Sequence, residues 1–103
     1  MITKGSETNA FIGNWDTTWT NAKATTPMQI NPNGTGSFAG EDGKLIGSFN
    51  ADNTVYTGHW EQKSNKATGE FTFTLKTPLT FQGTFTRTSP RGEGGPWNGT
   101  KVS

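Results

Sequence analysis

The chain has 103 residues, of which 28% are hydrophobic and 17% are charged, and its formal net charge is +1 at pH 7. This length suits one domain, and nine basic residues against eight acidic ones, scattered singly, leave no basic face for nucleic acid or an anionic membrane. The sequence has no cysteine, which excludes disulfides and thiolate metal sites.

The N-terminal segment 1–10, MITKGSETNA, is polar and predicts a flexible tail before a single domain over residues 11–103. It lacks the apolar stretch of a signal peptide, and no later run is long and apolar enough to predict a membrane span. A cytoplasmic location is expected if Met1 is the native start; a removed signal peptide would leave the location open.

From residue 11 onward, short runs with alternating polarity are separated by turn residues such as Asn31-Pro32-Asn33-Gly34 and Glu41-Asp42-Gly43. The predicted strands lie near 11–19, 24–31, 34–40, 44–50, 54–61, 67–76, 79–88 and 97–102. No window has apolar residues at helical spacing, so essentially no helix is expected. Short connections predict an all-β, antiparallel up-and-down meander that closes into an eight-stranded β-barrel, with a β-sandwich as the alternative.

The two-residue period of a strand divides the side chains between two faces. The predicted interior contains Phe11, Trp15, Trp19, Met28, Ile30, Phe38, Leu45, Phe49, Tyr56, Trp60, Phe71, Phe73, Leu75, Leu79, Phe81, Phe85 and Trp97. The predicted outer face contains Asn14, Asp16, Thr18, Ser48, Thr57, His59, Glu70, Thr72, Thr74, Gln82, Thr84 and Thr86. Glycines recur two positions from large residues on the inner face, which favours the barrel because they leave space for aromatic rings.

Strand direction predicts a candidate site at one end of this barrel. The longer connections 20–23, 62–66 and 89–96 share that end, and the glycine-rich segment 89–96 could close over it as a lid. The predicted ligand-binding residues are Trp19, Trp60, Phe85, Arg87 and Trp97. An apolar lining with few polar groups is typical of pockets in barrel mouths. The alternative is that these indoles cap the core and bind nothing.

The first strand contains Gly13-Asn14-Trp15, which resembles the G-x-W signature of the calycins, the lipocalin and avidin-like barrels. The later sequences TGSF, TGHW and GTF are similar to short strands of avidin-type proteins. The resemblance implies that a basic residue of the last strand, here Lys101, packs across Trp15. The polar ring that holds biotin in avidin-like proteins is not recognisable, so biotin is not expected. The chain is also similar to small bacterial β-domains of unassigned function.

Motifs for catalysis or metal binding are weak, and no cofactor, metal or catalytic residue is predicted. The lone histidine, His59, is expected on the outer face, where it cannot act as a buried base. Asn33-Gly34-Thr35 and Asn98-Gly99-Thr100 match the glycosylation pattern, which matters only in a eukaryotic secretory pathway.

The favoured function is therefore a binding module for a small apolar or aromatic ligand or a sugar, with neither nucleic acid nor membrane as partner. A structural domain that forms a homo-oligomer through the outward Ile46 and Val55 is the first alternative. A small isomerase or cyclase that uses an inward Tyr56 is the second. The outward threonines of strands 67–76 and 79–88 also permit an ice-binding surface, although threonine simply suits strands.

Overall fold

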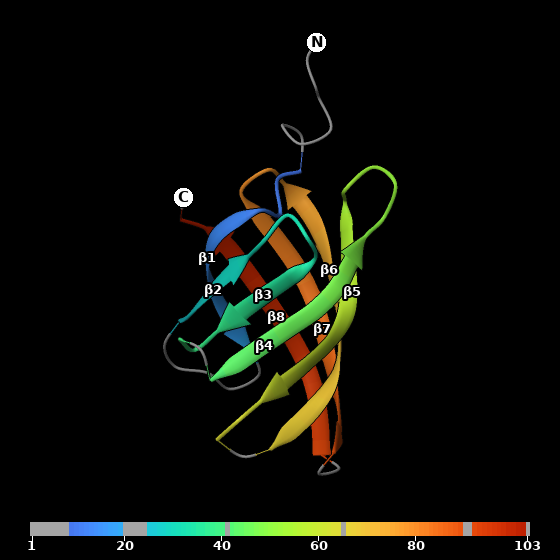
Figure 1. Ribbon diagram of the computed structural model, residues 1–103. Coiled ribbons are helices and arrows are strands. Elements are labelled where there is room, and N and C mark those ends of the chain that lie inside the picture. The colour runs from blue at the N-terminus through green and yellow to red at the C-terminus, as the bar shows by residue number, and fades with distance from the viewer. Residues whose placement is uncertain (1–8, 20–24, 41, 65, 90–91, 103) are drawn as a thin grey trace.

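The computed structural model describes residues 9–19, 25–40, 42–64, 66–89 and 92–102. Its strands are β1 Gly13–Trp19, β2 Thr26–Ile30, β3 Thr35–Phe38, β4 Gly43–Phe49, β5 Val55–Gln62, β6 Ala67–Thr77, β7 Thr80–Ser89 and β8 Gly92–Lys101. Consecutive strands pair antiparallel and β8 pairs with β1, which closes the barrel in sequence order (Figure 1). The predicted eight-stranded meander is thus confirmed.

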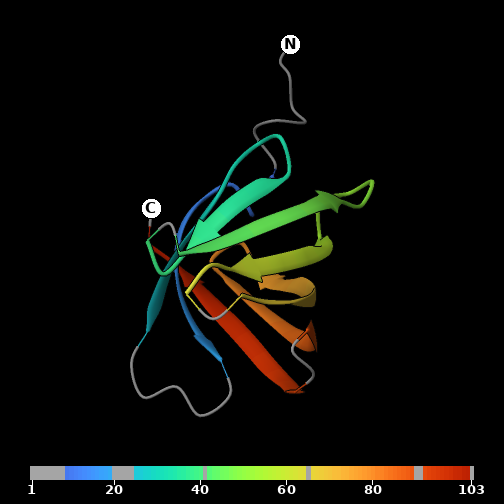
Figure 2. The same ribbon diagram turned by 60° about the horizontal axis from the view of Figure 1, so that its bottom comes forward.

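Within those ranges the chain forms no helix, so it also has no helix that could cross a membrane. Figure 2 shows the strands arranged around a common interior. The closing pair places Trp15 opposite Lys101 and Trp19 opposite Trp97. One end of the barrel carries the connections β2–β3, β4–β5 and β6–β7 together with the start of β1, and we call it the closed end. The opposite end, where β1, β3, β5 and β7 finish, is called the open end.

The last strand differs most from its prediction. β8 begins at Gly92 rather than near residue 97, and its first half pairs with β7 through Arg87↔Gly92 and Phe85↔Gly95. The prediction of a lid over 89–96 is therefore wrong for residues 92–96, while residues 90 and 91 lie outside the described part. Glycine and proline have low strand propensity, but main-chain pairing to a long neighbour outweighs that preference.

The interior matches the expected alternation closely. The buried hydrophobic residues are Phe11, Trp15, Met28, Ile30, Phe38, Leu45, Tyr56, Trp60, Ala67, Phe71, Phe73, Phe81, Phe85 and Trp97, with Trp19, Phe49 and Leu75 packed against them. The predicted outward residues all lie outside this core. The prediction that Leu79 faces the interior is wrong, because Leu79 lies in the β6–β7 turn and is 60% exposed. Thr17 is buried among the aromatic residues, and its hydroxyl donates to the Thr26 carbonyl at 2.9 Å.

Glycines provide the space that the aromatic rings occupy. A Cβ atom on Gly83 would lie 2.5 Å from the Phe73 ring, and one on Gly69 would lie 2.7 Å from the Trp60 indole nitrogen. Such distances are shorter than van der Waals contact, so these positions tolerate no side chain without movement of the ring. The alternation of large and absent side chains lets a small barrel hold this many rings.

The N-terminal turn seals the closed end. Phe11 was expected in a strand, but it lies in a turn before β1 and is fully buried against Phe49, Tyr56 and Phe81. The Asn9 side-chain oxygen accepts from the Phe11 amide at 3.1 Å, so Asn9 belongs to this turn rather than to a loose tail. Residues 1–8 lie outside the described part.

Lys101 fastens that turn to the last strand. Its Nζ donates to the carbonyls of Ala10 at 2.8 Å and Ile12 at 2.7 Å, and it lies 5.6 Å from the Trp15 ring centroid. Burial lowers the pKa of Lys101 because it disfavours the charged form. The contact expected between Lys101 and Trp15 is confirmed. It joins the last strand to the first, where the barrel closes.

Candidate functional site

An aromatic cluster fills the open end and brings together the ring residues predicted as a site. The indoles of Trp19 and Trp97 stack with centroids 5.1 Å apart and planes 21° from parallel. Phe85 lies at the centre of the cluster, with ring centroids 5.6 Å from Trp19, 6.2 Å from Trp60 and 5.7 Å from Trp97. These separations are those of favourable stacked and edge-to-face pairs.

The cluster grades from a sealed interior to a partly open rim. Trp97 is fully buried and Trp60 is 2% exposed, whereas Trp19 is half-buried at the end of β1. The Trp60 indole nitrogen donates to the Thr86 carbonyl at 3.1 Å, so the polar edge of Trp60 is occupied by the sheet. Trp19 is therefore the indole of this cluster with a surface available to solvent.

Arg87 lies beside the cluster, two residues beyond Phe85 on β7. Its Nε atom is buried without a hydrogen-bond partner, and so is the indole Nε1 of Trp97. Among the described residues these are the two buried side-chain polar atoms in that condition. A buried donor without an acceptor costs about 1–3 kcal/mol, and most buried polar groups in folded proteins have a hydrogen-bond partner in the protein or in ordered water.

The sheet is irregular on both sides of Arg87. Its pairing with β6 shifts register between Thr68 and Gly69, and its pairing with β8 shifts between Phe85 and Arg87. Gly92 lies opposite Arg87, where a Cβ atom would come within 2.9 Å of the arginine Cδ. Bulges re-aim side chains and are over-represented at barrel rims and next to active sites. The regular pairing of β7 with its two neighbours is therefore interrupted next to Arg87.

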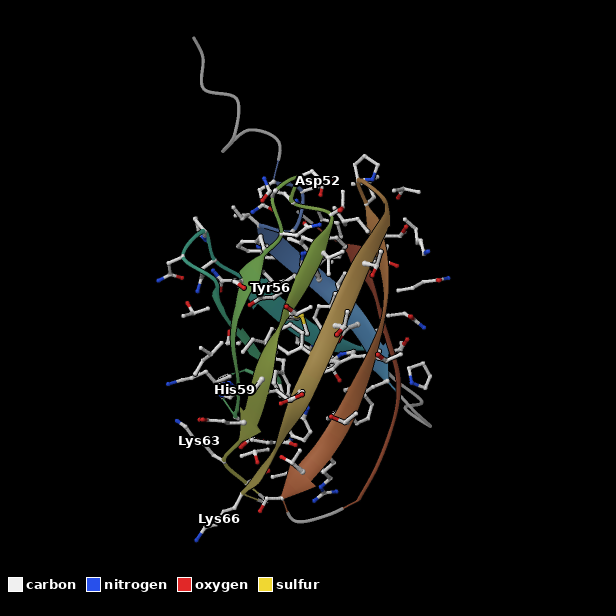
Figure 3. The ribbon with its side chains drawn as sticks, turned by 90° about the vertical axis from the view of Figure 1, so that its right-hand side faces the viewer. Asp52, Tyr56, His59, Lys63 and Lys66 are labelled. Carbon is white, nitrogen blue, oxygen red and sulfur yellow. The ribbon has the colours of Figure 1, made fainter. Side chains whose placement is uncertain are left out.

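Asp42 joins two connections at the same end of the barrel. Its carboxylate accepts from the Ser64 amide at 2.9 Å, the Ser64 hydroxyl at 2.9 Å and the Gln62 amide nitrogen at 3.0 Å. These hydrogen bonds, the Ser64 hydroxyl above all, lower the pKa of Asp42 because they favour its charged form. The β3–β4 turn is thereby tied to the β5–β6 hairpin, which carries Lys63 and Lys66 far from Asp52 at the closed end (Figure 3).

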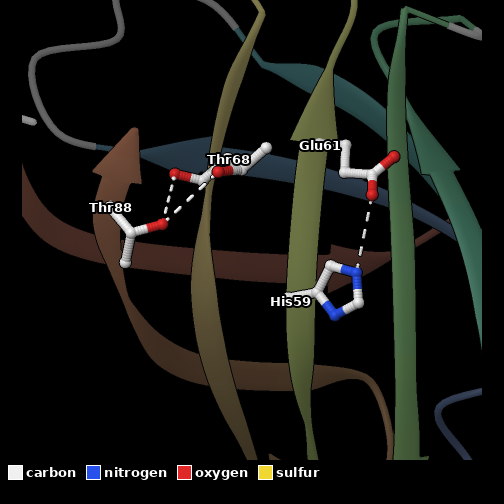
Figure 4. A network of polar contacts seen from close by, with 4 residues as sticks. All are labelled: His59, Glu61, Thr68 and Thr88. Atoms are coloured by element: carbon white, nitrogen blue, oxygen red, sulfur yellow. Dashed lines mark hydrogen bonds and ion pairs between the residues drawn. The ribbon is translucent and has the colours of Figure 1, made fainter. Parts of the chain in front are cut away.

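The outer face over β5, β6 and β7 is polar. His59 lies there as expected, with Nε2 3.6 Å from a carboxylate oxygen of Glu61, and the hydroxyls of Thr68 and Thr88 are 3.3 Å apart (Figure 4). A hollow on this face is lined by threonines together with His59 and Glu70. No group of three or more potential metal ligands occurs in the described part of the chain.

Tyr56, the inward tyrosine considered for an enzyme, is fully buried at the other end of the core. Its hydroxyl donates to the Gly34 carbonyl at 2.9 Å, and burial raises its pKa above the ordinary value for tyrosine. A neutral phenol that donates to a main-chain acceptor supports the fold. The outward residues considered for assembly are Ile46, 39% exposed, and Val55, which is half-buried.

Two residues at the open end were not predicted as part of the site. Phe38 is fully buried, with its ring 6.0 Å from Trp19 and 5.2 Å from Trp97. It was placed inside the barrel, but strand direction alone did not bring it to this cluster. Asp42 was treated only as a turn residue, and no sequence signal connects it with Gln62 and Ser64, which lie about two strands further along the chain.

Comparison with known proteins finds no matching family model and no match among curated proteins or solved structures. The closed antiparallel barrel is compatible with a calycin-like architecture.

Proposed function

We propose that this protein is a small-molecule binding module whose site is the open end of the barrel. The observation that carries this proposal is that two buried N–H groups lack acceptors in this half of the barrel, Arg87 Nε on β7 and Trp97 Nε1 in the aromatic cluster. A ligand that supplies an acceptor atom to Arg87 offsets the cost of burying that donor. A structural core with no ligand gains nothing from leaving these N–H groups unpaired.

The residues favour a flat ligand with an anionic or acceptor group. The guanidinium of Arg87 donates in a planar fork that fits a carboxylate, sulfonate or phosphate. Trp19 is half-buried, so its remaining surface can take an aromatic ring or the apolar face of a sugar. Phe85 and Trp97 pack against Trp19, and Trp60 packs against Phe85, so the rings form a rigid group, which limits the entropy lost on binding.

We also propose a relationship to the calycins that goes beyond a shared barrel. It is supported by the position of Lys101 across Trp15, by the G-x-W sequence at the start of β1 and by an N-terminal turn that seals the opposite end. Pockets in the mouths of β-barrels are a common place for small ligands, in agreement with the site proposed here.

The proposal is tested with the fluorescent probe 8-anilinonaphthalene-1-sulfonate, which combines flat aromatic rings with an anionic group. We expect saturable binding to the wild type and binding weakened about tenfold or more in Arg87→Gln, because a charge-assisted hydrogen bond is lost. Trp19→Leu should weaken it as well. Lys76→Gln is the matched control, since it removes an exposed cation from the closed end and should leave binding unchanged.

The urea unfolding midpoint of each variant is measured alongside, so that loss of the fold is not taken for loss of the site. Failure of the probe to saturate, or equal affinity in the wild type and Arg87→Gln, contradicts the proposal. Equal weakening in Lys76→Gln would show that the probe senses net charge only. A parallel screen by tryptophan fluorescence, with neutral aromatics, aromatic carboxylates and sugars, then separates the ligand classes.

A further inference from the structure

The sequence Asn-Gly-Thr occurs twice, at residues 33–35 and 98–100, in two very different structural settings. We infer that Asn33 is a site of spontaneous deamidation and isomerisation and that the fold protects Asn98. Glycine after asparagine has no Cβ to shield its main-chain nitrogen or to restrict the backbone, so this peptide can reach conformations closed to other residues. Two copies of one triplet make the effect of structure directly measurable.

The reaction is intramolecular. The Gly34 nitrogen attacks Cγ of Asn33, a new C–N bond forms, and the side-chain nitrogen leaves as ammonia after it takes up the proton released by the Gly34 nitrogen. Water then opens the resulting five-membered imide at either carbonyl. One opening gives aspartate, and the other gives isoaspartate, whose main chain runs through the former side chain. No oxidant or reductant takes part, and water is the second reactant.

The surroundings of Asn33 favour the first step. Its Oδ1, on which negative charge develops during the attack, accepts from the Thr35 amide at 3.1 Å and the Thr35 hydroxyl at 2.7 Å. Donors aimed at an oxygen where charge develops lower the barrier, as in an oxyanion hole. The Asn31 side-chain nitrogen donates in turn to the Thr35 hydroxyl at 3.1 Å, which polarises that hydroxyl further.

The attacking amide of Gly34 is itself only weakly hydrogen-bonded. Asn33 is exposed, and the Gly34 amide makes one long hydrogen bond, 3.2 Å, to the Asn31 carbonyl. Gly34 has φ of +92°, a region that glycine enters without strain. The attacking nitrogen therefore gives up one long hydrogen bond, while Gly34 is buried and held through its carbonyl.

Asn98 is held in a different way. It lies in β8, opposite Thr18 of β1, and its Oδ1 accepts from the Gly83 amide of β7 at 3.3 Å. The next residue, Gly99, is buried and paired on both sides, with Thr17 and Phe81. Imide formation there requires the strand to leave a closed barrel, which is a local unfolding event. We expect the rate at Asn98 in the folded protein to be lower by on the order of a hundredfold or more.

Isomerisation at Asn33 should disturb hydrogen bonds that involve a buried core residue. The Gly34 carbonyl accepts from the Gly47 amide at 2.9 Å and from the buried Tyr56 hydroxyl at 2.9 Å. Isoaspartate adds one carbon atom to the main chain directly before Gly34 and displaces this carbonyl. The isoaspartate form should therefore unfold at a lower urea concentration than the unmodified protein, whereas Asn33→Asp, which keeps the normal backbone, should not.

The experiment incubates the full chain in mildly alkaline buffer, folded and in concentrated urea, and follows both asparagines by peptide mapping with mass spectrometry. Isoaspartate is identified by enzymatic methylation. We expect the two sites to react at similar rates in urea, because their triplets are identical, and only Asn33 to react in the folded protein. Equal rates at both sites in the folded protein, or an intact Asn33 while the urea sample reacts, would overturn the inference.

The variant Thr35→Val tests the role of the threonine hydroxyl. Valine keeps the shape and β-branching of threonine and loses its donor, so Asn33 should react several-fold more slowly in the folded variant. In urea, where the turn is absent, the variant and the wild type should differ much less. An unchanged rate in the folded variant would overturn the part assigned to Thr35 and would leave the backbone of the turn as the difference from Asn98, whose side chain is exposed as well.

Discussion

At the closed end of the barrel, the polar groups that enter the core have acceptors: the Tyr56 hydroxyl has the Gly34 carbonyl, and the Trp15 indole nitrogen has the Phe11 carbonyl at 2.8 Å. At the open end, Arg87 Nε and Trp97 Nε1 have none. Both ends are built from packed aromatic rings, so burial does not distinguish them. The two ends therefore differ in their hydrogen bonds: the closed end pairs the donors named here, whereas the open end leaves two buried donors unpaired.

The largest effect on stability should come from removing the Phe11 ring, which fills the closed end of the barrel. Phe11→Ala deletes a fully buried ring that contacts four other aromatic residues, and we expect it to lower the free energy of unfolding by about 3–5 kcal/mol. Urea unfolding followed by circular dichroism measures the loss. Leu79→Ala, at a 60% exposed position of the same end, is the control and should change stability by about 0.5 kcal/mol or less. Similar losses in the two variants would mean that the N-terminal turn does not seal the barrel.

Lys101→Met should have the next largest effect. The change keeps a long side chain over Trp15 but removes the two hydrogen bonds to the Ala10 and Ile12 carbonyls. Hydrogen bonds from a charged donor are worth about 1.5–3 kcal/mol, and we expect a loss in that range by urea unfolding. Lys76→Met, at an exposed site, is the matched control. If both variants lose the same stability, the fastening of the N-terminal turn by Lys101 is wrong.

A pair of substitutions compares hydrogen bonding at the two ends directly. Tyr56→Phe leaves the Gly34 carbonyl one donor short and should cost about 1–2 kcal/mol. Arg87→Met removes a donor that had no partner and should leave stability unchanged or slightly higher. Both are measured by urea unfolding without ligand. A large loss in Arg87→Met would show that the open end depends on this arginine for its fold, and the contrast between the two ends would disappear.

The smallest effect concerns pH. Hydrogen bonds lower the pKa of Asp42 at the open end and of Asp52 at the closed end from the ordinary value of 3.8, with the Ser64 and Thr54 hydroxyls as the main causes. A carboxyl with a lowered folded-state pKa stabilises the fold above 3.8, and that contribution is lost as the pH falls through its folded-state value.

Asp42→Asn and Asp52→Asn should therefore each reduce the acid sensitivity of the urea midpoint below pH 3.8 by a small amount. The measurement compares the midpoints of both variants and the wild type in neutral and acidic buffer. If Asp42→Asn retains the full acid sensitivity of the wild type, the carboxylate does not hold the two connections of the open end together.

Alternation of polarity was enough to predict most of the fold. In residues 71–75 and 80–86, apolar and polar side chains lie on opposite faces with few exceptions, because successive side chains of a strand point to opposite faces of the sheet. The predictions failed where the sequence has no alternation of polar and apolar side chains. Leu79 was assigned inward across a turn that begins at Thr77, and the first half of β8 was missed because Gly92, Gly94 and Gly95 have no side chains to alternate.

The candidate site was predicted only in part, for a physical reason. Strand direction brought Trp19, Trp60, Phe85, Arg87 and Trp97 to one region, and the packing distances confirm their proximity for the aromatic members. Whether an indole nitrogen has an acceptor depends on the neighbouring strand and its register. The indole nitrogen of Trp60 donates to the Thr86 carbonyl, whereas that of Trp97 has no acceptor. The polarity pattern of the sequence does not predict this difference.

The sequence by itself determined the strand number, the inward and outward faces and the short turns, because these follow from a two-residue period and from local turn chemistry. Tertiary structure decided the rest: that β8 pairs with β7 and β1 to close the barrel, that Phe11 plugs one end, and that Arg87 lies between two shifts of register at the other. These features depend on contacts between residues far apart in the chain. Local propensity fixes the strands, whereas closure of the sheet fixes which side chains meet and which hydrogen bonds remain unmade.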